Sequence, residues 1–225
     1  MKIGIIAEGR ADQFVLRNIL YAFGVEHKDI RLIRPDIAAD EWDSNGKENV
    51  ENNKAFGSWT NVKNDCISRE PFEDFFDNTV GEKYMIVQLD TDICSEYGVQ
   101  EGLNIKEIGL HAFSVEMRNR IIEKVNEWLA ENYTENILYA ICIRQIDAWV
   151  LTIFAKQQDK DTGGIAMPKK ELQGKEAYQK LKGREVSVKY KLISEPFAKK
   201  KNLNQYIAYN QSLKDFVTSL ASVFN

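Results

Sequence analysis

Short apolar runs that alternate with helical segments are the feature that most constrains this fold. The three clearest runs are KIGIIA at 2–7, MIVQLD at 85–90 and NILYAICI at 136–143. Such runs are typical of strands that are buried on both faces of a parallel sheet. A fourth run, DIRLIR at 29–34, is expected to form a strand that Pro35 stops. Strands that alternate with helices predict an α/β fold, with a mostly parallel central sheet flanked by helices.

Helical periodicity marks the segments between these runs. Residues 12–23 repeat apolar side chains at helical spacing, and Asp12 is the expected N-cap. Residues 114–131 form the best amphipathic pattern of the chain, and Ser114 is its expected N-cap. Three further segments are expected to be helical: 63–79 with a break before Pro71, 145–155 and 210–224.

The length and composition fit one large domain with an appendage. The chain has 225 residues, of which 44% are hydrophobic and 28% charged, as in an ordinary globular protein. We expect an α/β core over 1–155 and a helical, basic C-terminal extension over 156–225 that packs on this core. The polar stretch DSNGKENVENN at 43–53 is expected to be a surface loop.

Three cysteines, Cys66, Cys94 and Cys142, lie far apart and form no CxxC pair. This spacing favours reduced, buried thiols in a cytoplasmic protein. The N-terminal run is broken by Glu8, and no stretch of about 18 apolar residues follows elsewhere, so neither a signal peptide nor a membrane span is expected.

Charge is distributed unevenly along the chain. Residues 156–201 hold 13 Lys or Arg against 6 Asp or Glu, a net charge of +7. Because the overall net charge is −4, the rest of the chain carries −11. A basic segment beside an acidic body suggests a polyanionic partner such as nucleic acid, with contacts from lysines such as Lys169 and Lys170. A solvated lysine-rich surface is the alternative interpretation.

Carboxylates follow the apolar runs. Glu8 comes just after the first run, and Asp90 and Asp92 come at the end of the run at 85–90. Because sites in open parallel sheets form outside the carboxyl ends of the strands, these side chains can converge. Clustered carboxylates repel one another unless a cation neutralises them, and their oxygens suit Mg²⁺ or Mn²⁺. Asp147 follows the last run and either joins this set or is an exposed residue of a helical first turn.

Several common sites lack their sequence motifs. No GxGxxG follows the first run and no GxxxxGK[ST] occurs, so neither dinucleotide nor P-loop binding is supported. His27 and His111 are the only histidines and lack metal-ligand companions, which argues against zinc hydrolysis. No GxSxG elbow is present.

Three short motifs together resemble the Toprim domain, a metal-binding α/β domain of topoisomerases, primases and overcoming-lysogenisation-defect nucleases. The motifs are IIAEGRADQFVLRNIL, MIVQLDTD and RQIDAWVL, and the last is similar to a segment of small stand-alone bacterial Toprim-like proteins. The resemblance covers roughly residues 1–155. The family pattern is a Glu after the first strand, often in an EG pair, and a DxD after a later strand.

The resemblance implies roles for individual residues. Glu8 would be a general acid/base or metal ligand, and Asp90 and Asp92 would hold Mg²⁺. Asp12 matches an acidic position that often follows the EG pair, and Asp147 stands where the small proteins more often have Glu. Arg10, or a lysine of the basic extension, is the expected cation that stabilises charge on the substrate.

Three functions remain open at this point. The first is a Mg²⁺- or Mn²⁺-dependent nuclease or related phosphotransfer enzyme, which the resemblance connects with bacterial phage defence. The second is a non-catalytic module that binds nucleic acid or protein, and the third is a metal-dependent hydrolase of a small phosphorylated substrate. An ATPase partner is compatible with the resemblance, since the chain lacks the ATPase domain of the larger nucleases. The oligomeric state is left open.

Overall fold

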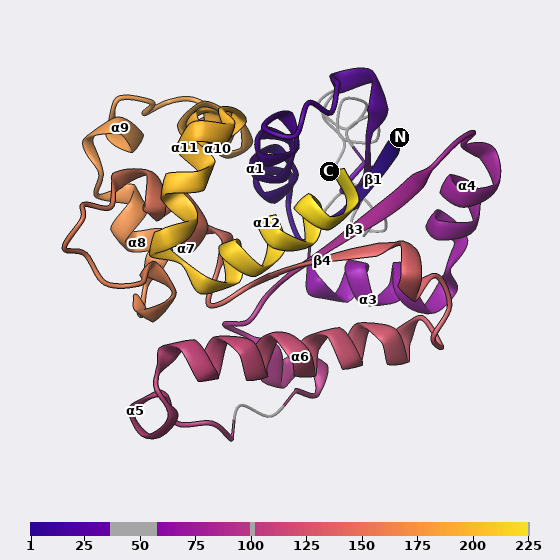
Figure 1. The fold of residues 1–225 in the computed structure, drawn as a ribbon, viewed down its shortest axis with the longest axis horizontal. Helices are drawn as coiled ribbons and strands as arrows, with labels where there is room; N and C mark the ends of the chain where they lie inside the picture. Colours follow the sequence, from indigo (N-terminus) through magenta and orange to yellow (C-terminus); the bar gives the residue numbers. More distant parts are fainter. Residues whose placement is uncertain (37–57, 100–101, 225) are drawn as a thin grey trace.

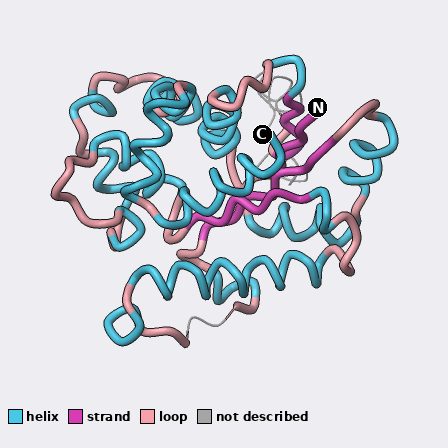
Figure 2. The backbone as a smooth tube through the Cα atoms, viewed as in Figure 1, coloured by secondary structure: helices cyan, strands magenta, loops and turns pink. Residues whose placement is uncertain are grey.

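The computed structural model describes residues 1–36, 58–99 and 102–224, so the expected surface loop at 43–53 lies outside the described residues. The described part contains four strands: β1 (Lys2–Ile6), β2 (Ile30–Arg34), β3 (Lys83–Asp90) and β4 (Ile137–Cys142). They form one sheet in the order β2-β1-β3-β4, and every neighbouring pair is parallel. The predicted parallel α/β fold is therefore confirmed (Figures 1 and 2).

The register of the sheet brings the strand ends of β1, β3 and β4 to one edge. Ile6 of β1 pairs with Val87 of β3, and Asp90 of β3 pairs with Cys142 of β4. Glu8 follows Ile6 by two residues, and Asp90 follows Val87 by three. Carboxylates far apart in sequence thus emerge at neighbouring points of the carboxyl edge.

Helices cover both faces of the sheet (Figure 1). One buried cluster joins the sheet to α1 (Arg10–Tyr21), α7 (Ile146–Leu151) and α12 (Gln211–Phe224). A second cluster, on the opposite side, includes residues of α3 (Trp59–Ser68), α4 (Glu70–Asn78) and α6 (Leu110–Trp128). Alternate residues of β1 divide between the two clusters, because side chains of a strand point to opposite faces in turn.

The C-terminal extension shares the core of the sheet. Tyr190, Phe197 and Leu213 belong to the same buried cluster as Ile3 and Leu16. The helix α10 (Val186–Ile193) packs closely on α1, as Figure 1 shows. The remaining short helices are α5 (Ile105–Ile108), α8 (Pro168–Gln173), α9 (Glu176–Gln179) and α11 (Lys200–Tyr206).

Two expected N-caps are wrong. The N-cap of α1 is Gly9, and Asp12 lies in the first turn, where its carboxylate receives a hydrogen bond from the Gly9 amide. The N-cap of α6 is Gly109, and Ser114 is buried inside the helix. The helix begins earlier because Leu110 and Phe113 already extend the apolar stripe at helical spacing.

The expected break before Pro71 is confirmed, since Arg69 separates α3 from α4 with a left-handed backbone at φ 61°.

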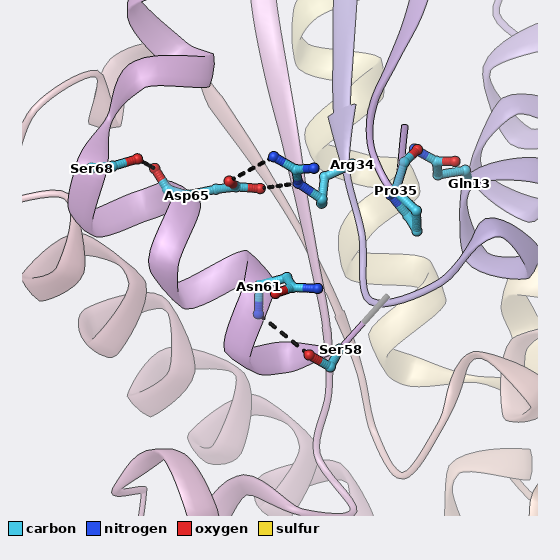
Figure 3. Close-up of polar contacts among 7 residues, drawn as sticks. All are labelled: Gln13, Arg34, Pro35, Ser58, Asn61, Asp65 and Ser68. Atoms are coloured by element: carbon cyan, nitrogen blue, oxygen red, sulfur yellow. Dashed lines mark hydrogen bonds and ion pairs between the residues drawn. The ribbon is translucent and has the colours of Figure 1, made fainter. Parts of the chain in front are cut away.

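Polar contacts anchor the carboxyl end of β2. Arg34 donates from Nε to Asp65 Oδ2 (2.7 Å) and from Nη2 to Asp65 Oδ1 (3.1 Å), which joins β2 to α3 (Figure 3). The Gln13 side chain of α1 donates to the carbonyl of Pro35 (3.1 Å) on the other side of that strand end. These contacts fix the start of α1 relative to the sheet, and with it the residues that follow Glu8.

All three cysteines are free and buried, as expected. Among the described residues, no helix is long and apolar enough to cross a membrane.

Candidate active site

Glu8 and Asp90 lie against each other at the carboxyl edge of the sheet. The Asp90 amide donates to Glu8 Oε1 at 2.6 Å. Gln88 completes a reciprocal link: its Oε1 accepts from the Glu8 amide (2.9 Å), and its Nε2 donates to Asp90 Oδ1 (2.8 Å). The buried Gln88 side chain therefore holds the ends of β1 and β3 together.

Asp147 and Asp12 approach this pair from two helices. The helix α7 starts soon after β4, and the Ile146 amide at its start donates to Asp90 Oδ1 (3.1 Å). Asp147 is the next residue, is buried, and accepts a hydrogen bond from the Tyr190 hydroxyl. Asp12 is buried in the first turn of α1.

Asp92 lies at the exposed side of the same edge. Its Oδ2 accepts a hydrogen bond from the Gln145 side chain at 2.7 Å. Asp92 carries charge close enough to raise the pKa of both Glu8 and Asp90. The structure thus brings together Glu8, Asp12, Asp90, Asp92 and Asp147, all five acidic residues that the sequence singled out.

Burial and mutual repulsion shift the acidity of these groups. Burial raises the pKa of Glu8 to about 7; the Asp90 amide opposes this rise and the charge of Asp92 adds to it. The pKa values of Asp12 and Asp90 are held well above the ordinary value, first by burial and then by the neighbouring carboxylates. Glu8 therefore titrates near neutral pH, where a general acid/base works best.

Hydrogen bonds and two cations moderate the rise in the pKa values of Asp147 and Asp92. Burial raises the pKa of Asp147, while the Tyr190 hydroxyl and the nearby charge of Lys169 lower it. Burial also raises the pKa of Asp92, against the hydrogen bond from Gln145 and the charge of Arg144. The lysine and the arginine thus supply positive charge on one side of the carboxylates.

The expected cations fall in two places. Arg10 lies in the first turn of α1, with its Nη1 3.7 Å from Glu185 Oε1, so it faces the segment that precedes α10. Lys169 and Lys170 lie on α8 and line a cleft of about 630 Å³ that also includes Asp92. The basic extension therefore reaches the carboxylates at this cleft.

Four neighbouring residues were not anticipated from the sequence. Gln88, Arg144, Gln145 and Tyr190 all contact or line the site. Gln88 had a signal, because it is the one polar residue inside the run MIVQL. Tyr190 had none, since it lies 43 residues from its partner Asp147 in a lysine-rich segment.

The donor chemistry of the site fits a hard divalent cation. Carboxylate oxygens are the ligands that Mg²⁺ and Mn²⁺ prefer, and a cation would relieve the repulsion that raises these pKa values. Within the described residues, however, no three His, Cys, Asp or Glu side chains are arranged as a ready metal-binding group. Glu8, Asp90 and Asp92 each give an oxygen to a hydrogen bond inside the protein, with which a cation would compete.

The fold and this edge define an α/β protein with a carboxylate-rich site at the carboxyl ends of its strands. No protein-family model, curated protein or solved structure matches the chain.

Proposed function

We propose that this protein is a Mg²⁺- or Mn²⁺-dependent nuclease that cleaves phosphodiester bonds of nucleic acid. The observation that carries this proposal is the direct contact of Glu8 with the Asp90 amide, with Asp12, Asp92 and Asp147 around them. Carboxylates that raise one another's pKa are costly to stability, which is typical of groups retained for chemistry. The Toprim resemblance of the same residues supports the reaction class.

Glu8, Asp90 and Asp92 would hold the metal, since they lie nearest to the open side of the edge. Such a metal, when bound, neutralises charge on the phosphate oxygens and lowers the pKa of a bound water. Glu8 also suits proton transfer, because its pKa of about 7 allows both protonation states at neutral pH.

Asp12 and Asp147 act from behind this pair. Both are buried and lie near the positive charge of Lys169. Their negative field favours protons or cations at Glu8 and Asp90. The hydrogen bond from Tyr190 fixes the orientation of the Asp147 carboxylate.

A small phosphorylated substrate is the second candidate. The cleft of about 630 Å³ is in the range of a small-molecule site, and an overall charge of −4 favours a long duplex less than a small ligand. The wider context proposed for the nuclease is bacterial phage defence with an ATPase partner, which depends on the resemblance alone, and a cytoplasmic location, which depends on the three unpaired cysteines.

Cleavage assays test the proposal. The purified protein is incubated with single-stranded DNA, duplex DNA and RNA, each with Mn²⁺, with Mg²⁺ and with a chelator. We expect metal-dependent cleavage of at least one polymer that Glu8→Gln and Asp90→Asn abolish. Asp77→Asn, an equal change at an exposed position of α4, is the matched control and should retain activity.

Three outcomes oppose the nuclease. Cleavage that survives in Glu8→Gln and Asp90→Asn would come from a contaminant. Release of inorganic phosphate from nucleotides, without cleavage of any polymer, would favour the small-substrate hydrolase. Binding of nucleic acid without any reaction would favour the non-catalytic module.

A further inference from the structure

A positively charged cleft opens beside the carboxylates. It lies between the turn that joins β4 to α7 and the start of α8, and Asp92 forms one wall. Its charged lining consists of three cations, Arg144, Lys169 and Lys170, against the single carboxylate of Asp92. The cleft is therefore suited to an anion that extends from the carboxylate edge.

Arg144 is held in this cleft by an unusual backbone conformation. Its φ is 70°, in the left-handed region that favours glycine. The Arg144 amide donates to Thr91 Oγ1 (2.7 Å), and its carbonyl accepts from the amides of Thr91 (3.0 Å) and Asp92 (3.1 Å). The loop after β3 thus clamps Arg144 on both sides and fixes where its side chain starts.

The cations of the cleft form no close ion pair within the part of the chain that the structure describes. Among the described residues, no ion pair within 4.0 Å involves Arg144, Lys169 or Lys170. The Arg144 Nε is buried and has no hydrogen-bond partner in the same part of the chain. A buried guanidinium nitrogen without an acceptor lacks a bond that an anionic ligand would supply.

The donor geometry and charge of Arg144, Lys169 and Lys170 favour a phosphate as the ligand of the cleft. A guanidinium binds phosphate oxygens as a two-pronged donor, whereas lysines act as mobile point charges around it. Met167, whose surface is 61% exposed, and Pro168 add an apolar wall next to the lysines. Such a wall accommodates the sugar or base that accompanies a phosphate in a nucleotide.

We propose that this cleft is the subsite for a phosphate next to the scissile one, and that Arg144 is its specificity-determining residue, in the nuclease proposed above. The strand passes from the carboxylates past Asp92, and its next phosphate lies between Arg144 and the two lysines. Arg144 does not take part in bond cleavage.

Binding without metal tests the subsite separately from catalysis. A fluorescent single-stranded oligonucleotide is titrated with the intact protein in a chelator at several salt concentrations. Arg144→Gln should weaken binding roughly tenfold, the loss expected for one charge-assisted contact. The slope of log K against log salt should fall by about 0.7, the value for one phosphate contact on a single strand.

The matched control is Arg184→Gln, which removes the same charge from an exposed position of the basic extension outside the cleft. It should bind almost as the parent does. Arg144→Gly suits the left-handed backbone and keeps the test valid if the glutamine variant folds poorly. A nucleoside monophosphate is then added as a competitor. Displacement of the oligonucleotide at a low concentration of monophosphate would indicate that the cleft binds a small phosphorylated ligand rather than a nucleic-acid strand.

The outcomes distinguish the subsite from the nuclease. Weakened binding in both Arg144 variants supports the subsite even if no metal brings about cleavage, in which case only the proposed function fails. Equal losses in Arg144→Gln and Arg184→Gln would overturn the subsite, as would unchanged binding in both. A parent protein that binds neither the oligonucleotide nor the monophosphate would overturn it as well.

Discussion

The hydroxyl of Tyr190 donates a hydrogen bond to the buried carboxylate of Asp147. This contact joins α10 of the C-terminal extension to α7 at the carboxylate edge. Asn18 of α1 holds the same helix, since its Nδ2 donates to Ser194 Oγ (2.7 Å) and to the Lys191 carbonyl (2.9 Å). The extension is therefore a structural part of the candidate site.

Tyr190→Phe should destabilise the protein by about 1–2 kcal/mol, because it removes one of the donors to a buried carboxylate. The pKa of Asp147 should rise further, since the hydroxyl lowers it. Urea denaturation at neutral pH measures the change. Tyr178→Phe is the matched control: Tyr178 is also buried, and no hydrogen bond of its hydroxyl is found among the described residues. Equal losses in the two variants would mean that packing, not the hydrogen bond, accounts for the effect.

Asp90→Asn should leave the stability of the metal-free protein unchanged or raise it. The amide oxygen of asparagine can still accept from Gln88 and Ile146, while the repulsion from Glu8 and Asp12 is lost. The melting temperature of the parent should rise with millimolar Mn²⁺, and that of the variant should not. A parent melting temperature that ignores Mn²⁺ would count against a metal site, whereas a variant that still responds would remove Asp90 from it.

The metal-free protein should lose stability as pH rises from about 4.5 to about 7, because burial raises the pKa of folded Glu8 to about 7 from 4.5. In that window the folded state holds a proton that the unfolded state has released, so deprotonation favours unfolding. The stabilisation from the protonated Glu8 carboxyl is complete below pH 4.5 and is lost as the pH rises to the folded pKa of about 7. Its upper limit is about 3 kcal/mol. Urea denaturation across this range in a chelator measures it. The fall of the unfolding free energy with pH should be smaller in Glu8→Gln. An unchanged pH dependence would assign the effect to other carboxylates.

The sequence predicted the sheet and the carboxylate cluster for the same physical reason. Buried parallel strands need continuous apolar runs, and parallel strands end at one edge, so residues that follow the runs at Glu8 and Asp90 converge without any knowledge of loops. The strand register then sets how closely they meet. This is why short local patterns were sufficient for contacts between residues 82 positions apart.

Contacts that depend on tertiary packing could not be predicted in this way. The Tyr190 contact requires α10 to pack on α1, and no local pattern encodes that choice. The N-caps at Asp12 and Ser114 were wrong because a capping side chain was assumed, whereas the structure starts both helices at glycines. Arg144 begins the motif RQIDAWVL, but its left-handed backbone depends on bonds to Thr91 and Asp92, far away in sequence, so its place at the site was not predicted.

Arg144→Gly should stabilise the protein by about 1 kcal/mol, because glycine adopts a left-handed backbone without the steric cost of a side chain. The backbone bonds to Thr91 and Asp92 do not involve the side chain and should persist. Arg144→Ala keeps a Cβ at φ 70° and should not stabilise, which makes it the control. Denaturation midpoints measure all three proteins. A glycine variant less stable than the parent would show that the arginine side chain contributes packing that outweighs its backbone cost.

Two lysine pairs of the basic extension should differ in their effect on nucleic-acid binding. Lys169 and Lys170 line the cleft next to Asp92, so Lys169→Ala/Lys170→Ala should weaken oligonucleotide binding and reduce its dependence on salt. Lys199 lines a separate cavity, and Lys200 Nζ lies 3.4 Å from the centre of the Phe23 ring, where it packs on the protein. Lys199→Ala/Lys200→Ala removes the same charge. Because Lys200 packs on Phe23 and neither lysine lines the cleft, this variant should lower the free energy of unfolding and leave oligonucleotide binding nearly unchanged. Equal weakening by the two pairs in fluorescence titrations would mean that the whole extension attracts the polyanion diffusely, without a defined cleft.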